Sequence, residues 1–222
     1  MDLIGATPPA ARRRAGQHAR ATQRRLAHHA IGKVLAAFSP LVLAIVLLGF
    51  GWATCAIELG VVFGMMVVDR RTAPVVSRWG RGAAGEELVG YTLDGLRERG
   101  WFALHDVQLD HGNIDHVLIG PAGIFTIETK SHRGRLRAAA IDSRMLKQAY
   151  AQAKSVERIT GLRAAPLLVF SSAYLIPAVT ERRGVVILPS RMLVNYLRQR
   201  GGTIPPERVE YVYRRLAAAL PG

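Results

Sequence analysis

Three charged residues, Asp115, Glu128 and Lys130, stand in a stretch that otherwise reads as two buried strands. The segment 120–123, Gly-Pro-Ala-Gly, separates the strands, and its proline and glycines are typical of a tight turn. If the strands pair symmetrically about this turn, Asp115 comes opposite Glu128 on one face of the sheet. Two carboxylates in that arrangement repel each other, and a divalent cation would relieve the repulsion.

The chemistry that such a group can support is metal-assisted hydrolysis. Mg²⁺ binds to one or two carboxylates and keeps open water positions. It activates water and stabilises a phosphoryl transition state, and Lys130 on the same face adds positive charge. The prediction depends on the register, because a slip of one residue would turn Asp115 to the opposite face. The alternative is a salt bridge between Glu128 and Lys130 on a solvated surface.

Four short motifs in this part of the chain resemble those of one family: GAAGE at 82–86, HDV at 105–107, NIDH at 113–116 and GIFTIETK at 123–130. Their order is similar to the nuclease-related domain, NERD, of bacterial proteins, over roughly residues 80 to 160. Asp115 with Glu128 and Lys130 looks like the metal site of the PD-(D/E)xK nuclease superfamily. The resemblance implies a Mg²⁺- or Mn²⁺-dependent nuclease in which Asp115 and Glu128 hold the metal and Lys130 orients or activates water.

Glu86 and Gln148 complete the predicted site. Residues 83–99 predict a helix ended by Gly100, with Glu86 on its apolar face. The helix macrodipole is another explanation for an acid in a first turn, whereas the resemblance implies an accessory metal or water ligand. Gln148, in a helix predicted over 142–161, matches the position where the family often carries glutamine in contact with substrate or metal-bound water. Gln152, one turn later, is a rival for that role.

The order of predicted elements indicates an α/β domain. After the helix at 83–99 come a strand at 101–109, the hairpin at 114–130, a short extension near 134–138, the helix at 142–161, strands at 166–170 and 185–188, and helices near 190–200 and 206–219. This order predicts a mixed sheet flanked by helices, and the resemblance implies a restriction-endonuclease-like fold. In the extension, arginines 133, 135 and 137 alternate on one face, where they either follow a nucleic-acid backbone or protect a solvated edge.

Composition limits the classes of site and partner. The formal net charge of +14 fits a polyanionic partner, either nucleic acid or an anionic membrane face. The single cysteine, Cys55, excludes an intrachain disulfide framework and a cysteine-based zinc cluster. The histidines at 105, 111 and 116 match no common zinc spacing, so we expect them to be ordinary sheet or loop residues.

Residues 34–68 form an apolar run in which Glu58 is the only charged residue. The run is longer than the roughly 20 residues of one membrane span, and arginines flank it on both sides, which favours a transmembrane helical hairpin bending near 49–51. One span from Val34 to Thr54 with an interfacial second helix, or a soluble buried hairpin, are the alternatives. The predicted organisation is a basic N-terminal segment (1–33), a membrane anchor (34–68), a basic linker (69–81) and the nuclease-related domain (82–222).

Together these patterns predict a nuclease anchored in the inner membrane, by one or two crossings, with its α/β domain in the cytoplasm. It would hydrolyse phosphodiester bonds of nucleic acid, with DNA favoured, and its other partner would be a bilayer with anionic headgroups. The alternative function is a non-catalytic, membrane-tethered module that retains the nuclease fold and binds nucleic acid or protein.

Overall fold

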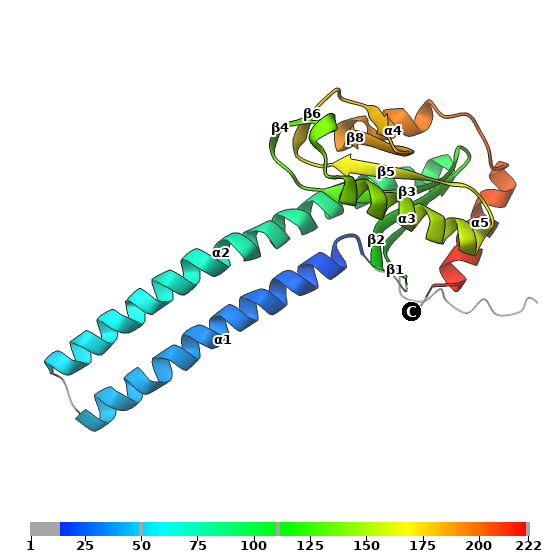
Figure 1. Cartoon of the computed structure of the whole chain (residues 1–222). Helices are drawn as coiled ribbons and strands as arrows, with labels where there is room; N and C mark the ends of the chain where they lie inside the picture. The colour runs from blue at the N-terminus through cyan, green and yellow to red at the C-terminus, as the bar shows by residue number, and fades with distance from the viewer. Residues whose placement is uncertain (1–13, 49–50, 110–111, 221–222) are drawn as a thin grey trace, which may run out of the picture. The chain divides into compact units, whose positions relative to one another are not determined.

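The structure, a computed structural model, describes residues 14–48, 51–109 and 112–220 (Figure 1). They divide into two compact units, His18–Arg81 and Gly82 onward together with the segment up to Gln17. The helices are α1 (Gln17–Leu48), α2 (Trp52–Asp94), η1 (Arg97–Arg99), η2 (Ala138–Ala140), α3 (Ser143–Thr160), α4 (Ser190–Arg198) and α5 (Pro206–Ala218). The strands are β1 (Phe102–Leu109), β2 (Gly112–Gly120), β3 (Gly123–Lys130), β4 (Gly134–Arg137), β5 (Ala164–Phe170), β6 (Ala173–Ile176), β7 (Thr180–Arg182) and β8 (Val185–Pro189).

The predicted transmembrane hairpin is wrong. Across the residues that the structure describes, no helix combines the length and the apolar character that a membrane crossing requires. The apolar run of residues 34–68 is divided between α1, which ends at Leu48, and α2, which begins at Trp52. Each helix therefore carries less of the run than the roughly 20 residues of a span. The predicted inner-membrane location depended on this hairpin and is corrected with it. The bend expected near 49–51 falls largely on residues 49–50, outside the described residues.

Helix α2 is longer than the sequence suggests. It runs without interruption from Trp52 to Asp94, so the residues predicted as a linker, 69–81, are helical and the helix predicted to begin at 83 begins far earlier. Its predicted end is close to the observed one, because a short 3-10 turn, η1, follows and Gly100 closes it with a left-handed φ of 77°. The part of α2 from Gly82 to Asp94 belongs to the unit that starts at Gly82.

The unit from Gly82 onward contains a mixed sheet, as predicted, and this sheet has six strands. Its strand order is β1-β2-β3-β5-β8-β7, with antiparallel pairs β1–β2, β2–β3 and β7–β8 and parallel pairs β3–β5 and β5–β8. The predicted hairpin register is confirmed from Ile119 with Ile124 as far as His116 with Ile127. The predicted pairing of Asp115 with Glu128 lies one step beyond the last observed pair and is not part of the ladder. A separate parallel pair, β4 with β6, extends the unit beyond the main sheet.

Helices pack on both faces of the sheet. The end of α2 and helix α4 bury Val89, Leu93 and Leu193 in one core cluster with Phe125 and Ile127. Helices α3 and α5 bury a second cluster on the opposite face, which includes Ile124 of β3 (Figure 1). Because side chains alternate along a strand, the even-numbered residues of β3 face α3. Glu128 and Lys130 therefore project from the sheet on the side of α3.

Candidate active site

Asp115 lies at a break in the sheet. The β1–β2 ladder pairs residues on both sides of this level but leaves out Asp106 and Asp115, and the β2–β3 ladder ends at His116 and Ile127. Asp106 has a left-handed φ of 53°, which is uncommon for a residue other than glycine. Beyond the end of the ladder, the backbone N–H of Thr129 donates to Asp115 Oδ2 at 2.7 Å. The aspartate side chain thus replaces a ladder hydrogen bond.

Glu128 is the most enclosed acid of the site, with 4% of its surface exposed. Its Oε1 accepts from Lys130 Nζ at 2.6 Å and from Gln148 Nε2 at 3.0 Å. Its Oε2 accepts from Gln152 Nε2 at 2.7 Å. These donors fix the orientation of the carboxylate and offset part of the cost of its burial.

Helix α3 positions both glutamines. Its N-cap Asp142 accepts from the backbone N–H of Arg144, and Gly161 ends it with a φ of 71°, so the observed bounds match the predicted helix. Residues 148 and 152 lie four apart and hence on one helical face. Gln148 is exposed, whereas Gln152 is partly buried and also donates to the backbone oxygen of Asn113 at 2.8 Å. The predicted glutamine and its rival both contact Glu128.

Glu86 enters the site from α2, on the opposite layer. It lies deep within that helix, and no acidic residue occupies the first turn, so the macrodipole does not explain its presence. Burial, with added repulsion from Glu128 and Asp106, raises the pKa of Glu86 to about 7. The neighbouring Gly85 permits the approach, because a Cβ there would lie 2.5 Å from Ser171 Oγ at the end of β5.

The acids of the site act on one another. Burial raises the pKa of Asp115 well above its ordinary value, and the charges of Glu128 and Glu86 raise it further, against the opposing effects of the Thr129 amide and Lys130. Burial lowers the pKa of Lys130, but the attraction of Glu128 and the other acids outweighs it, so the net shift is upward. Lys130 therefore stays charged at neutral pH. One ammonium group faces three carboxyl groups, and the site favours additional positive charge.

The donor set can be compared with the needs of a metal ion. Within the described ranges, no group of three or more His, Cys, Asp or Glu side chains is arranged to hold one. Mg²⁺ needs only one or two carboxylates and otherwise takes water and carbonyl oxygens. Asp115 and Glu128 supply such carboxylates. Two buried amide oxygens, Asn113 Oδ1 and Gln152 Oε1, have no hydrogen-bond partner in the described structure. An all-oxygen set with excess negative charge fits a hydrated hard dication.

Sequence reasoning missed the contribution of Asp106 and Asn113. Asn113 Nδ2 donates to Asp106 Oδ1 at 2.5 Å, and the charge of Asp106 acts on Glu86. A signal was present, because the β1–β2 register that pairs His105 with His116 puts Asp106 level with Asp115. The predicted register covers only β2 with β3, and it therefore gives Asp115 one neighbour rather than two.

His116 contacts a second histidine. Its Nδ1 lies 2.9 Å from Nδ1 of His105, whose Nε2 lies 3.1 Å from Asp94 Oδ1. His116 is fully buried, and burial together with His105 lowers its pKa well below the ordinary value. The pair links the sheet to the end of α2.

Comparison with known proteins locates a family in the same region. The sequence profile of the nuclease-related domain, NERD, matches residues 81–176, which confirms the predicted resemblance. An uncharacterized protein of Bacillus anthracis is 38% identical over 64 residues, which are 27% of this chain and 30% of that protein. The chain thus spans less than a third of the length of that relative. The crystal structure of a repair endonuclease from Pyrococcus abyssi aligns over 52% of this chain and 43% of its own, with 16% identity and a TM-score of 0.28.

Proposed function

Residues 81–176 of this chain match the nuclease-related domain, and from that premise we propose that the protein is a divalent-metal-dependent nuclease of the PD-(D/E)xK type. It hydrolyses phosphodiester bonds, with DNA as the favoured substrate, and the activity belongs to residues 82–222. The observation that supports this most is the pair of Asp115 and Glu128, held beside Lys130 where the β2–β3 ladder ends.

Asp115 and Glu128 are the proposed metal ligands, with Glu86 as an accessory ligand to the metal or its water. Glu128 has about four acceptor positions, of which the donors described above take three. Burial and mutual repulsion raise the pKa of both Asp115 and Glu86, and such repulsion is what a cation removes. When bound, Mg²⁺ or Mn²⁺ supplies charge stabilisation and acidifies a coordinated water.

The side chains of this domain supply the remaining functions. Lys130, charged and partly buried, orients the attacking water and stabilises negative charge that develops on the phosphoryl oxygens. Gln148 and Gln152 hold the Glu128 carboxylate in place. Gln148 is the more exposed of the two and so is the one able to reach substrate or metal-bound water.

A non-catalytic nucleic-acid-binding module is the second candidate. One observation favours it: among the residues that the structure describes, no arrangement of three or more His, Cys, Asp or Glu is suited to a metal ion. Such a module would bind nucleic acid with the salt dependence of phosphate contacts, but Mg²⁺ or Mn²⁺ would leave its thermal stability unchanged.

The test is cleavage of end-labelled DNA by the full chain with Mg²⁺ or Mn²⁺. We expect products that EDTA abolishes and that Asp115→Asn reduces at least about 100-fold, as for other groups that support transition-state charge. Glu98→Gln is the matched control, since it also neutralises an acid but alters an exposed residue of η1. Equal cleavage by wild type and Asp115→Asn would overturn the proposal.

A further inference from the structure

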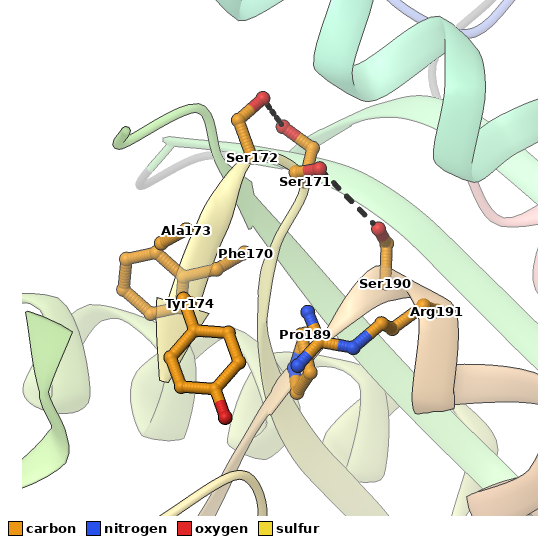
Figure 2. Close-up of a pocket in the computed structure, with 8 residues that line it drawn as sticks. All are labelled: Phe170, Ser171, Ser172, Ala173, Tyr174, Pro189, Ser190 and Arg191. Carbon is orange, nitrogen blue, oxygen red and sulfur yellow. Dashed lines mark hydrogen bonds between the residues drawn. The ribbon is translucent and has the colours of Figure 1, made fainter. Parts of the chain in front are cut away.

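A pocket of about 220 Å³ lies where β5 and β8 end (Figure 2). It is lined by residues 170–174 and 189–191, which include three serines, a tyrosine and an arginine. The two strands are parallel neighbours, with Phe170 paired to Pro189 at their carboxyl ends. In open α/β sheets this end of the strands is where ligands bind.

The pocket adjoins the candidate active site. Ser171 is the connection, because its backbone N–H donates to the carbonyl oxygen of Lys130 at 3.0 Å. Gly85, next to Glu86 in α2, packs directly on the Ser171 side chain. The end of β3 that carries Lys130 therefore borders a residue that lines the pocket.

The pocket offers neutral donors of the kind that contact phosphate. Ser171 and Ser172 have their hydroxyl oxygens 3.5 Å apart, and Ser190 Oγ donates to the Ser171 carbonyl at 3.5 Å (Figure 2). Both contacts are at the long limit for hydrogen bonds between oxygens, so they hold these hydroxyl groups weakly. Helix α4 begins at Ser190 after Pro189, and no side chain caps it. Serine hydroxyls and first-turn amides commonly contact phosphate oxygens.

Tyr174 adds an aromatic surface with cations beside it. It is 54% exposed, and the guanidinium carbons of Arg191 and Arg135 lie 5.3 and 5.9 Å from its ring centroid. Arg191 belongs to α4, whereas Arg135 is paired with Tyr174 across the β4–β6 ladder. An exposed ring among arginines is the arrangement that holds single strands, since bases stack on the ring while the cations neutralise the backbone.

We propose that this pocket binds an unpaired segment of the substrate strand, with a base stacked on Tyr174 and the adjoining phosphate held by Arg191 and the serine hydroxyls. The inference rests on the proposed function, because it assigns to the same active site a strand that continues past Lys130. It goes beyond that function in specifying single-stranded or frayed nucleic acid.

The test measures binding of a fluorescent oligothymidylate to the full chain by anisotropy in EDTA, so that cleavage plays no part. Tyr174→Leu is expected to weaken binding at least about fivefold, the lower end of the effect of one stacked base. Tyr211→Leu is the matched control, because Tyr211 is similarly exposed, at 60%, but lies on α5. Thermal unfolding curves check that both variants are folded. Equal affinity of the Tyr174 and Tyr211 variants for the oligothymidylate would overturn the inference.

Two further comparisons identify the ligand. Arg191→Gln should lower the slope of log affinity against log salt by about 0.7, as for one phosphate contact to a single strand. Arg208→Gln, an exposed arginine of α5, should leave the slope unchanged. The loss caused by Tyr174→Leu should be larger for the single strand than for a blunt duplex of the same length. An equal loss on both would exclude stacking of an unpaired base.

Failure of the pocket to bind a strand and failure of the proposed nuclease function give different experimental results. If Asp115→Asn abolishes cleavage while Tyr174→Leu binds normally, the active site stands and this pocket is excluded. If no preparation cleaves but Tyr174→Leu and Arg191→Gln weaken binding as expected, the pocket stands and the hydrolytic activity is excluded.

Discussion

The backbone amide of Thr129 donates to Asp115 Oδ2 at 2.7 Å, immediately past the last paired residues of β2 and β3. This contact connects an acid of one strand to the backbone of the strand that carries Glu128. Burial, together with the charges of Glu128 and Glu86, keeps the pKa of Asp115 well above its ordinary value, although the Thr129 amide lowers it. The site thus combines a fixed geometry with negative charge that is only partly compensated. We therefore expect the stability of the protein to depend on that charge.

Asp115→Asn should stabilise the protein when metal is absent. The substitution removes a charge repelled by Glu128 and Glu86 but keeps an oxygen that can accept from Thr129. We expect a higher Tm than wild type in EDTA at pH 8, measured by calorimetry. A lower Tm would mean that the charge of Asp115 is stabilised by more than the Thr129 amide and Lys130.

Glu86→Gln should change the pH dependence of stability. The folded-state pKa of Glu86 is about 7 against an ordinary 4.5, so the folded protein holds a proton that the unfolded chain has released between these values. This contribution lowers the free energy of unfolding as pH rises from 4.5 through 7. Denaturant titrations in EDTA should therefore show that the free energy of unfolding of Glu86→Gln, relative to that of wild type, increases by about 1–3 kcal/mol between pH 4.5 and pH 8. Glu98→Gln, at an exposed residue of η1, is the control, and an identical gain there would exclude a specific effect at Glu86.

His116 should contribute the opposite pH dependence. Its pKa in the folded protein lies well below the ordinary 6.5, so the unfolded chain binds a proton first and stability falls as pH drops below 6.5. The slope from this single site is at most about 1.4 kcal/mol per pH unit. Comparison of His116→Leu with wild type at pH 7.5 and 5.5 isolates the contribution of His116 to the free energy of unfolding. The variant should lose less stability than wild type on acidification. Parallel profiles would contradict this.

Gln152→Leu should be more destabilising than Gln148→Leu. Loss of Gln152 removes the donor of two acceptors, Glu128 Oε2 and the Asn113 backbone oxygen. Loss of Gln148 removes only one of the two donors to Glu128 Oε1. An unsatisfied buried acceptor costs about 1–3 kcal/mol. We expect the Gln152 variant to be less stable than the Gln148 variant by about that amount in urea titrations. The reverse order would show that the exposed glutamine is the main support of Glu128.

The hairpin was predictable because its determinants are local. The turn at 120–123 and the alternation around it fixed the register, and with it the face of Glu128 and Lys130. The break at Asp115 was not predictable in this way. It depends on the unusual backbone of Asp106 and on the Thr129 amide, which belong to two different strands.

The incorrect and incomplete predictions concern features that depend on residues far apart in the sequence. The apolar run of 34–68 was assessed as one segment, although its break into α1 and α2 leaves neither part long enough for a span. Gln148 and Gln152 could not be distinguished by sequence, because both lie on the face of α3 that meets β3. Glu86 was placed correctly on the apolar face, yet the true start of its helix lies more than thirty residues earlier.

The most direct test of the cation site proposed at Asp115 and Glu128 is a Mn²⁺ titration of the full chain, with free Mn²⁺ followed by electron paramagnetic resonance. Wild type and Glu98→Gln should bind Mn²⁺ with the same affinity, and Asp115→Asn and Glu128→Gln should each weaken that binding by at least about tenfold. If all four proteins bind Mn²⁺ equally, or none binds it, the two acids do not form a metal site and the account is contradicted.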